Sequence, residues 1–260
     1  MRSQKSLSYL STISIALCIE FVTLSLGVSP LRAQSLQLSL EFPPTENVGA
    51  PSRSTSGGTR SPQEACIKGS TSLAALAPSN NVLTTASYNP TLYWYVPQTK
   101  AKSAEFVVKD KDSDNQEREI YKATVALNGN SGIVKLTIPA SVYLATDKNY
   151  LWQFALICDR TDNSVNNYVE GWMKRTELSW DQQRKLAAEK EPLQQAEMYA
   201  KANIWQEAVT ILAQLRSERP NDSKIATAWK ELLASVYIEE SISAAPLLEC
   251  CTVDSVSNSQ

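Results

Sequence analysis

The chain has 260 residues, of which 43% are hydrophobic and 20% are charged, a composition typical of a globular protein. A formal charge of −2 without a basic cluster argues against nucleic-acid binding. Histidine is absent, which excludes Ser-His-Asp and Cys-His catalysis and imidazole metal ligands.

The first segment has the order of a secretory signal. Arg2 and Lys5 precede an apolar stretch over residues 7–28, and Ala33 offers a small residue before a cleavage point. We therefore predict a signal peptide over residues 1–33. An uncleaved membrane anchor is the alternative, because the apolar stretch could nearly span a bilayer. In both cases we expect the rest of the protein to be exported.

Residues 34–56 are expected to form a flexible linker. Pro43, Pro44 and Pro51 interrupt a serine-rich stretch that has few large apolar side chains. Such a composition does not supply enough apolar surface for a core.

From residue 57 to residue 176 the hydrophobic pattern has a period of two, which predicts a mainly β fold built as a β-sandwich. In the clearest run, from Tyr150 to Cys158, Trp152 and Phe154 share one strand face. Turn residues separate six such runs. The predicted strands are 92–96, 104–109, 119–127, 132–138, 150–158 and 165–173.

A helical period follows over residues 177–240. Ser179 and Gln182 can form a capping box for a helix that ends before Pro192. Another helix should end before Pro220, and Asp222 can cap the last one. Residues 241–260 are predicted to be a disordered C-terminus.

The helical region contains a spacing that resembles a tetratricopeptide repeat. Tyr199, Ala208, Leu212 and Pro220 stand at the corresponding positions, whereas Asn203 replaces the usual turn glycine. A single repeat-like hairpin needs another surface to stack on. We therefore expect a small helical hairpin module that packs on neighbouring helices or on the end of the sandwich.

The β region resembles known sandwich folds. Leu144 and Tyr150, ahead of an alternating strand, are similar to the tyrosine corner of fibronectin type III domains, in which the tyrosine bonds back to upstream backbone. This resemblance implies an immunoglobulin or fibronectin III-like sandwich.

Several motifs also occur in a fixed order along the mature chain. They are Gly57-Gly58-Thr59-Arg60, Cys66, the runs 90–97, 104–108 and 150–154, Cys158, and Gly171-Trp172 with Arg175. Together they resemble DUF928, a cyanobacterial family of exported proteins of unknown function. The resemblance implies a cyanobacterial origin, and with it export to the periplasm or outer envelope of a Gram-negative-type cell, but no activity. Members tend to be encoded near membrane sensor proteins, which implies an envelope signalling or secretion context.

Cys66 and Cys158 are the two cysteines of the predicted sandwich, and we expect a disulfide between them because the compartment is oxidising. Closing a loop of about ninety residues would contribute on the order of 4 kcal/mol. Two buried free thiols are the alternative, and a redox role lacks the usual Cys-x-x-Cys spacing. Cys250 and Cys251 lie in the tail, without a role that the sequence assigns.

Tyr93, Tyr95 and Trp172 form a candidate recognition surface for a sugar or a protein. The alternative is that the helical tail covers the two tyrosines, because both parts of the chain need a packing partner.

The acidic residues carry no predicted metal site or catalytic pair. Residues 110–114 resemble the opening of a calcium loop, but Asn115 and Tyr121 replace its required glycine and glutamate. No spacing indicates that the strand residues Glu105, Glu117 and Glu170 converge. We therefore expect no metal, no cofactor and no enzymatic activity.

The sequence favours a non-catalytic exported interaction or scaffold module of the cell envelope. We expect its partner to be another envelope protein, and membrane attachment only if the signal segment is not cleaved. The alternative is a small-ligand or glycan-sensing domain that acts with a membrane signalling protein. A divergent carboxylate hydrolase is the third interpretation.

Overall fold

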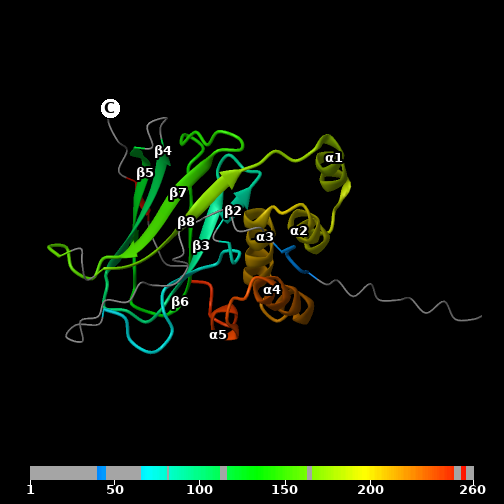
Figure 1. Ribbon diagram of the computed structural model, residues 1–260. Coiled ribbons are helices and arrows are strands. Elements are labelled where there is room, and N and C mark those ends of the chain that lie inside the picture. The colour runs from blue at the N-terminus through cyan, green and yellow to red at the C-terminus, as the bar shows by residue number, and fades with distance from the viewer. Residues whose placement is uncertain are drawn as a thin grey trace, which may run out of the picture. The chain divides into compact units, whose positions relative to one another are not determined.

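The computed structural model describes residues 40–44, 66–80, 82–111, 116–162, 166–248 and 253–255 (Figure 1). These residues belong to one compact unit, Leu38–Gln260. The predicted signal peptide and most of the predicted linker lie outside the described residues, as do Cys250 and Cys251.

The described strands form two sheets, so the prediction of a mainly β fold is confirmed. One sheet has three antiparallel strands in the order β1-β3-β6, and the other has six in the order β2-β8-β7-β4-β5-β9. Among the pairs of described strands, only β2–β8 is parallel. The strands are β1 (Ala74–Ala75), β2 (Val82–Thr85), β3 (Thr91–Val96), β4 (Ser103–Lys111), β5 (Glu117–Ala126), β6 (Gly132–Thr137), β7 (Asn149–Leu156), β8 (Asn167–Arg175) and β9 (Val253–Ser255).

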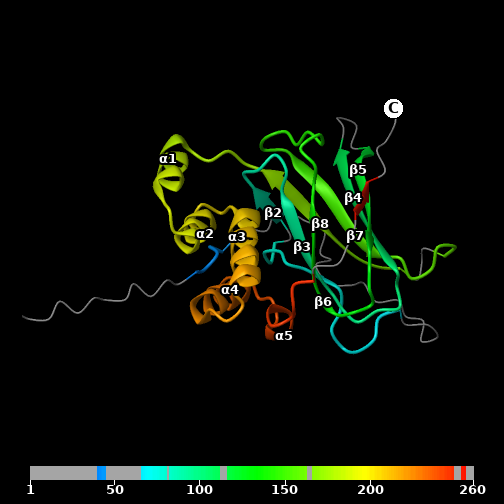
Figure 2. The ribbon, with the colours of Figure 1, turned by 180° about the vertical axis from the view of Figure 1, so that it is seen from behind.

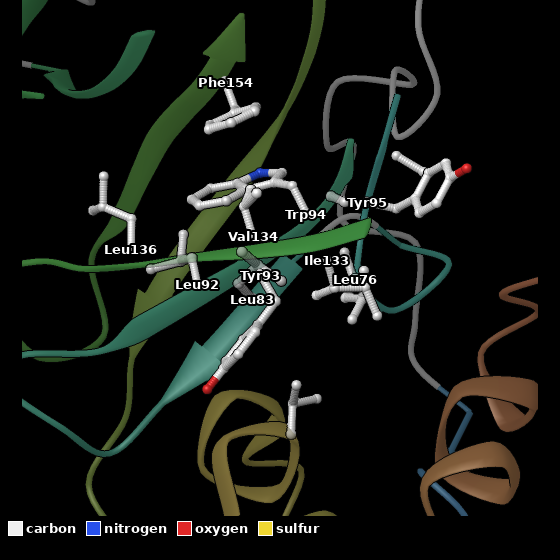
Figure 3. Packing of buried hydrophobic residues seen from close by; sticks show 14 of the residues in the cluster. Leu76, Leu83, Leu92, Tyr93, Trp94, Tyr95, Ile133, Val134, Leu136 and Phe154 are labelled. Carbon is white, nitrogen blue, oxygen red and sulfur yellow. The ribbon is translucent and has the colours of Figure 1, made fainter. Parts of the chain in front are cut away.

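The two sheets pack against each other through aromatic rings. Trp94 of β3 stacks on Phe154 of β7 with 4.4 Å between ring centroids, and it contacts Phe106 of β4 at 5.0 Å. All three side chains are fully buried, and Figure 3 shows the rings of Trp94 and Phe154 facing each other. Because strand residues alternate between faces, Tyr93 and Tyr95 must point away from this aromatic layer.

The described residues also form five helices, with the caps that the sequence predicts. Ser179 and Gln182 make the capping box, and the Asp222 side chain accepts from Lys224 N and Ile225 N. Pro192 opens a helix, a position where its missing N–H costs nothing. The helices are α1 (Trp180–Ala188), α2 (Pro192–Lys201), α3 (Trp205–Glu218), α4 (Ser223–Ser235) and α5 (Glu240–Ser243).

Helix α3 joins the helices to the sheets. It contacts both β2 and β3, as the views from the front and from behind indicate (Figures 1 and 2). The buried Trp205 donates from Nε1 to Leu76 O at 2.8 Å, and its backbone N donates to Thr84 Oγ1 at 3.0 Å. Residues 57–176 and 177–240, which the sequence divides into two domains, therefore share one hydrophobic core.

The predicted linker over residues 34–56 needs a correction at residues 40–44. Leu40 and Phe42 are buried, and Phe42 makes an edge contact with Trp205 at 5.0 Å. The backbone N of Phe42 donates to Ser235 Oγ at 3.0 Å. This short segment packs on α3 and α4 because Leu40 and Phe42 supply two large apolar side chains, with the charged Glu41 between them.

The predicted disordered C-terminus over residues 241–260 is wrong for residues 241–248. Ile242 and Ala245 are buried, and Trp229 Nε1 donates to Ser243 O at 2.8 Å. Leu248 N then donates to Ile133 O of β6 at 2.8 Å. The chain after α4 thus returns to the three-stranded sheet.

The turn between α2 and α3 generates a prediction. Asn203 has a positive φ of 58° and an exposed side chain. Asparagine tolerates this left-handed conformation, whereas a β-branched residue does not. Asn203→Val should lower the free energy of unfolding by about 1–2 kcal/mol, measured by chemical denaturation with the disulfide intact.

Asn203→Gly is the matched control, because glycine adopts positive φ without a steric cost. We expect its stability to stay within about 0.5 kcal/mol of the wild type. Equal losses in both variants would show that the asparagine side chain, and not the backbone conformation, is what the turn needs.

Candidate functional site

The two predicted sandwich cysteines are joined in a disulfide. Cys66 and Cys158 have Cα atoms 5.5 Å apart and are separated by 92 residues in sequence. Cys66 O accepts from Lys100 N at 2.9 Å, and Cys158 N donates to Asn166 Oδ1 at 2.8 Å. The bridge ties the segment before β1 to the chain just beyond β7, which is a structural role.

Tyr93 and Tyr95 do not form an exposed recognition surface. They are only 4% and 8% exposed. The Tyr93 hydroxyl forms a hydrogen bond with the Thr210 side chain of α3, and burial raises its pKa above the ordinary value. Figure 3 shows the Tyr93 side chain extending from the sheet toward a helix. For Tyr93 the helical tail is therefore the cover, as the alternative interpretation predicts.

Trp172 lies in a different sheet from the two tyrosines. It is half-buried on β8, opposite Leu151 of β7, and Lys111 Nζ lies 5.5 Å from its ring centroid. The three residues of the predicted recognition surface are therefore not brought together, because they belong to separate sheets.

Three of the acidic residues considered from the sequence, Glu105, Glu117 and Asp110, lie in ion pairs, whereas Glu170 lies on β8 opposite Gln153 of β7. Lys122 Nζ is 2.7 Å from Glu105 Oε2, and Lys109 Nζ is 3.0 Å from Glu117 Oε2. Asp110 pairs with Lys148 at 2.5 Å, while residues 112–115 of the calcium-like loop lie outside the described residues. Among the described residues, no group of three or more acidic or cysteine side chains is placed to hold a metal ion.

A cavity that we call the hairpin pocket lies between the β2–β3 connection and helices α2 and α3. Its volume is about 230 Å³. One wall comes from residues 87–91, and the other comes from the helical hairpin. The lining residues are Ser87, Asn89, Pro90, Thr91, Gln195, Tyr199, Gln206, Glu207, Thr210 and Ile211.

Glu207 holds the two walls of the pocket together. Its Oε1 accepts from Thr85 Oγ1 at 2.6 Å, from Ser87 N at 3.0 Å and from Ala86 N at 3.2 Å. Its Oε2 is buried and has no hydrogen-bond partner among the described residues. Burial raises the pKa of this carboxyl, and hydrogen bonds, above all the one from Thr85, oppose that shift only in part.

Gln206 is the second unusual group of the pocket. The residue is 1% exposed, and neither Oε1 nor Nε2 has a hydrogen-bond partner in the described part of the chain. A buried amide without partners is costly, because both its donor and its acceptor lose their bonds to water. Both atoms are closed to solvent, so they do not face the open space of the pocket.

Tyr199 completes the polar part of the pocket. Its pKa is raised by burial and then by the charge of Glu207, which places its hydroxyl within the electrostatic reach of that carboxylate. No lysine or arginine lines the pocket. The arrangement can therefore exchange hydrogen bonds with a ligand, but it offers only one carboxyl group.

Sequence reasoning did not single out Gln206 or Glu207. The signal available was weak. The helical pattern assigns Trp205 and Ala208 to the buried face, and these two polar residues stand between them. The pocket itself joins residues about 120 positions apart, such as Ser87 and Glu207. That separation is beyond the reach of any local pattern.

The chain matches the family described as Domain of Unknown Function (DUF928) over residues 55–247, well over half of its length. It belongs to the DUF928 family. No curated protein and no solved structure shows significant similarity to it. The family therefore accounts for the sequence motifs but leaves the pocket without an assigned ligand.

The unpaired amide generates a prediction about stability. Gln206→Met replaces the side chain by an apolar one of similar length, which removes two buried unpaired polar atoms. We expect the free energy of unfolding to rise by about 1 kcal/mol, and the Tm by about 2–4 °C, in ligand-free protein.

Gln214→Met is the matched control, because Gln214 is exposed on the same helix. Its stability should change by less than about 0.5 kcal/mol. A large loss of stability in Gln206→Met would mean that the amide has partners in solution, and would contradict the account of the pocket.

Glu207 generates a prediction about pH. Its folded-state pKa is raised above the ordinary 4.5, so the folded protein binds this proton more tightly than the unfolded chain does. Stability from this group is therefore present at low pH and is lost as the pH rises from about 4.5 to the folded pKa.

The measurement is the free energy of unfolding of the wild type minus that of Glu207→Gln, followed across this range. The difference should fall as the pH rises and should become constant above the folded pKa. Glu218→Gln, at an exposed position of the same helix, should show no such fall. A difference that grows with pH would contradict the direction of the shift.

Proposed function

We propose that this DUF928 protein is a non-catalytic binding module exported to the cell envelope. In this proposal the two sheets are a rigid scaffold with an immunoglobulin or fibronectin III-like arrangement, and the helical hairpin supplies the binding face. The observation that carries the proposal is the hairpin pocket, a cavity of about 230 Å³ between the scaffold and the helical hairpin, with polar side chains such as Ser87, Asn89 and Thr210 among its lining residues.

The chemistry of the pocket supports a binding role over catalysis. Histidine is absent from the chain, and Glu207 is the only carboxyl group among the lining residues. A carboxylate hydrolase needs two carboxyl groups that flank the reacting bond. Oε1 of Glu207 already accepts three hydrogen bonds from the scaffold, and its Oε2 is closed to solvent, so this carboxyl is not placed to act on a bound molecule.

Two observations support export. Residues 1–33 have the order of a signal peptide, and the chain joins Cys66 to Cys158 in a bond that persists in oxidising compartments. Among the described residues, every helix is too short or too polar to cross a membrane. On the signal-like segment and the disulfide, the proposed location is the periplasm or outer envelope.

Two kinds of partner are compatible with this proposal, an envelope protein and a small ligand, and different features favour them. An envelope protein partner is favoured by Trp180, which is 78% exposed at the start of α1. A small-ligand sensor that acts with a membrane signalling protein is favoured by the pocket. We give the pocket precedence, because an exposed tryptophan alone does not define a partner.

Local contacts support two finer parts of the proposal, the fibronectin III-like sandwich and the tetratricopeptide-like hairpin. The Tyr150 hydroxyl accepts a hydrogen bond from Ala145 N at 2.8 Å, a link to upstream backbone similar to the tyrosine corner. Helices α2 and α3 pack together, with Ala196, Ala200 and Ala208 buried, in keeping with a tetratricopeptide-like hairpin.

The proposal is tested with the oxidised mature chain and an envelope extract divided into a small-molecule fraction and a protein fraction. Native mass spectrometry should detect a bound component that is recovered unchanged after release. Glu207→Gln should weaken capture from the small-molecule fraction, and Glu218→Gln should not. Conversion of the component into products would show that the protein is an enzyme.

Export is tested by mass spectrometry of protein from its native host. The mature chain should begin at Gln34 or within a few residues of it, because Ala33 precedes the predicted cleavage point. An intact Met1 in the membrane fraction would replace the cleaved signal by an anchor.

A further inference from the structure

Arg175 is a buried cation to which no carboxylate of the described residues is paired. It is the last residue of β8 and is 5% exposed. The nearby carboxylate of Asp147 pairs with Lys174 instead, at 3.4 Å. A buried charge is costly unless it is paired and hydrogen-bonded, so the surroundings of this guanidinium need an explanation.

Neutral groups hold the guanidinium of Arg175 in place. Its Nε donates to Leu144 O at 2.7 Å, and its Nη2 donates to Thr146 Oγ1. Thr146 Oγ1 in turn donates to Glu177 Oε1 at 3.3 Å, so that carboxylate is one hydroxyl group away from the guanidinium. A side chain that is already fixed loses little entropy when a ligand binds to it.

Part of the guanidinium remains available for binding. A guanidinium carries five N–H groups, and two of them are on Nη1. Nη1 of Arg175 donates to none of the described residues, because the hydrogen bonds of this side chain come from Nε and Nη2. It is not closed to solvent, whereas the unpaired Nη1 of Arg216 is. A ligand can therefore reach donors that the fold leaves unused.

Tyr88 forms one side of this site. Its ring centroid lies 4.3 Å from Arg175 Cζ, and the residue is 59% exposed. Stacking on an aromatic face is favourable for a guanidinium. The backbone next to Tyr88 is also held, because Ala86 N and Ser87 N donate to Glu207 Oε1. Both sides of the site are thus positioned by the fold.

The donors and the local charges define the ligand. Unused N–H groups on a cation need an acceptor, and a negatively charged acceptor gives the stronger hydrogen bond. Asp147 and Glu177 lie at this end of the sheet with Lys174 and Arg175, so the four charges sum to about zero. A doubly charged phosphate would therefore be repelled more than a singly charged carboxylate, and a planar carboxylate also matches the planar guanidinium.

We propose that Nη1 of Arg175, beside the ring of Tyr88, binds one carboxylate group of a ligand. The carboxylate is carried by a small carboxylic acid or by a peptide, with the same chemistry at Arg175. Neither residue lines the hairpin pocket, so this second site goes beyond the proposed function.

The test is NMR of the arginine side-chain N–H groups in the isotope-labelled, oxidised mature protein. Sodium acetate and acetyl-Gly-Asp-Gly-amide are the two carboxylate probes, one a small acid and the other a peptide. Acetamide is the neutral comparator, and inorganic phosphate and chloride are the other anions, all at matched ionic strength. Arg118, whose side chain is 76% exposed, and Arg216 serve as internal controls.

Acetate should shift the Arg175 signals until they saturate, and acetamide and chloride should not. The signals of Arg118 and Arg216 should show no saturable shift. Tyr88→Ala should weaken acetate binding about threefold, through the loss of one cation–π contact beside the bound anion. Tyr237→Ala, at another exposed tyrosine, should bind acetate like the wild type. A response of Arg175 to the peptide would assign the carboxylate to a peptide, and a response to acetate alone would assign it to a small acid.

The inference is overturned if neither carboxylate probe shifts the Arg175 signals, if acetamide acts as acetate does, or if Arg118 responds like Arg175. Tighter binding of phosphate than of acetate would overturn the choice of a carboxylate. Capture of a component from the envelope extract depends on none of these results. Failure of this second site and failure of the hairpin pocket are therefore distinguishable.

Discussion

The structure depends on how the first turn of α3 attaches to the edge of the sheets. Trp205 is fully buried there, and its ring and backbone nitrogens donate to Leu76 O and Thr84 Oγ1. Two residues later, Glu207 accepts from the side chain of Thr85 and from the backbone of Ala86 and Ser87. A buried carboxylate is tolerated only when hydrogen bonds replace its water, and here those bonds also align the connection that leads into β3. The same attachment creates the hairpin pocket and covers Tyr93.

Segments at both ends of the described chain strengthen this attachment. Phe42 packs on Trp205 from the N-terminal side, and Leu248 joins β6 from the C-terminal side. The Cys66–Cys158 bridge fixes the chain ahead of β1 to the end of β7, which limits how far the unfolded chain can expand. Sheets and helices consequently share one core, so a destabilising substitution in α3 should lower the stability of both.

Local patterns in the sequence predicted much of this architecture. The alternation around Trp152 located β7, the Ser179 capping box located α1, and the two cysteines were paired correctly. Strand β2 was missed because it has four residues and pairs in parallel with β8, which is distant in sequence. Leu40 and Phe42 were assigned to a linker because isolated apolar residues in a Pro- and Ser-rich stretch give no periodic signal. The pocket was missed for a related reason. In the sequence Glu207 is one acidic residue on a helix, and its partner Ser87 lies 120 residues away.

The central claim is that the Glu207 carboxylate locks α3 to the β2–β3 connection. Hydrogen exchange measured by NMR tests it most directly, at the amides of Ala86 and Ser87 and at the indole N–H of Trp205. In the folded wild type these three groups should exchange slowly, because each donates to a partner in the fold. In Glu207→Ala the two amides should exchange faster, while amides in the centre of β7 stay protected. Rapid exchange of Ala86 and Ser87 in the wild type, or equal exchange in both proteins, would contradict the claim.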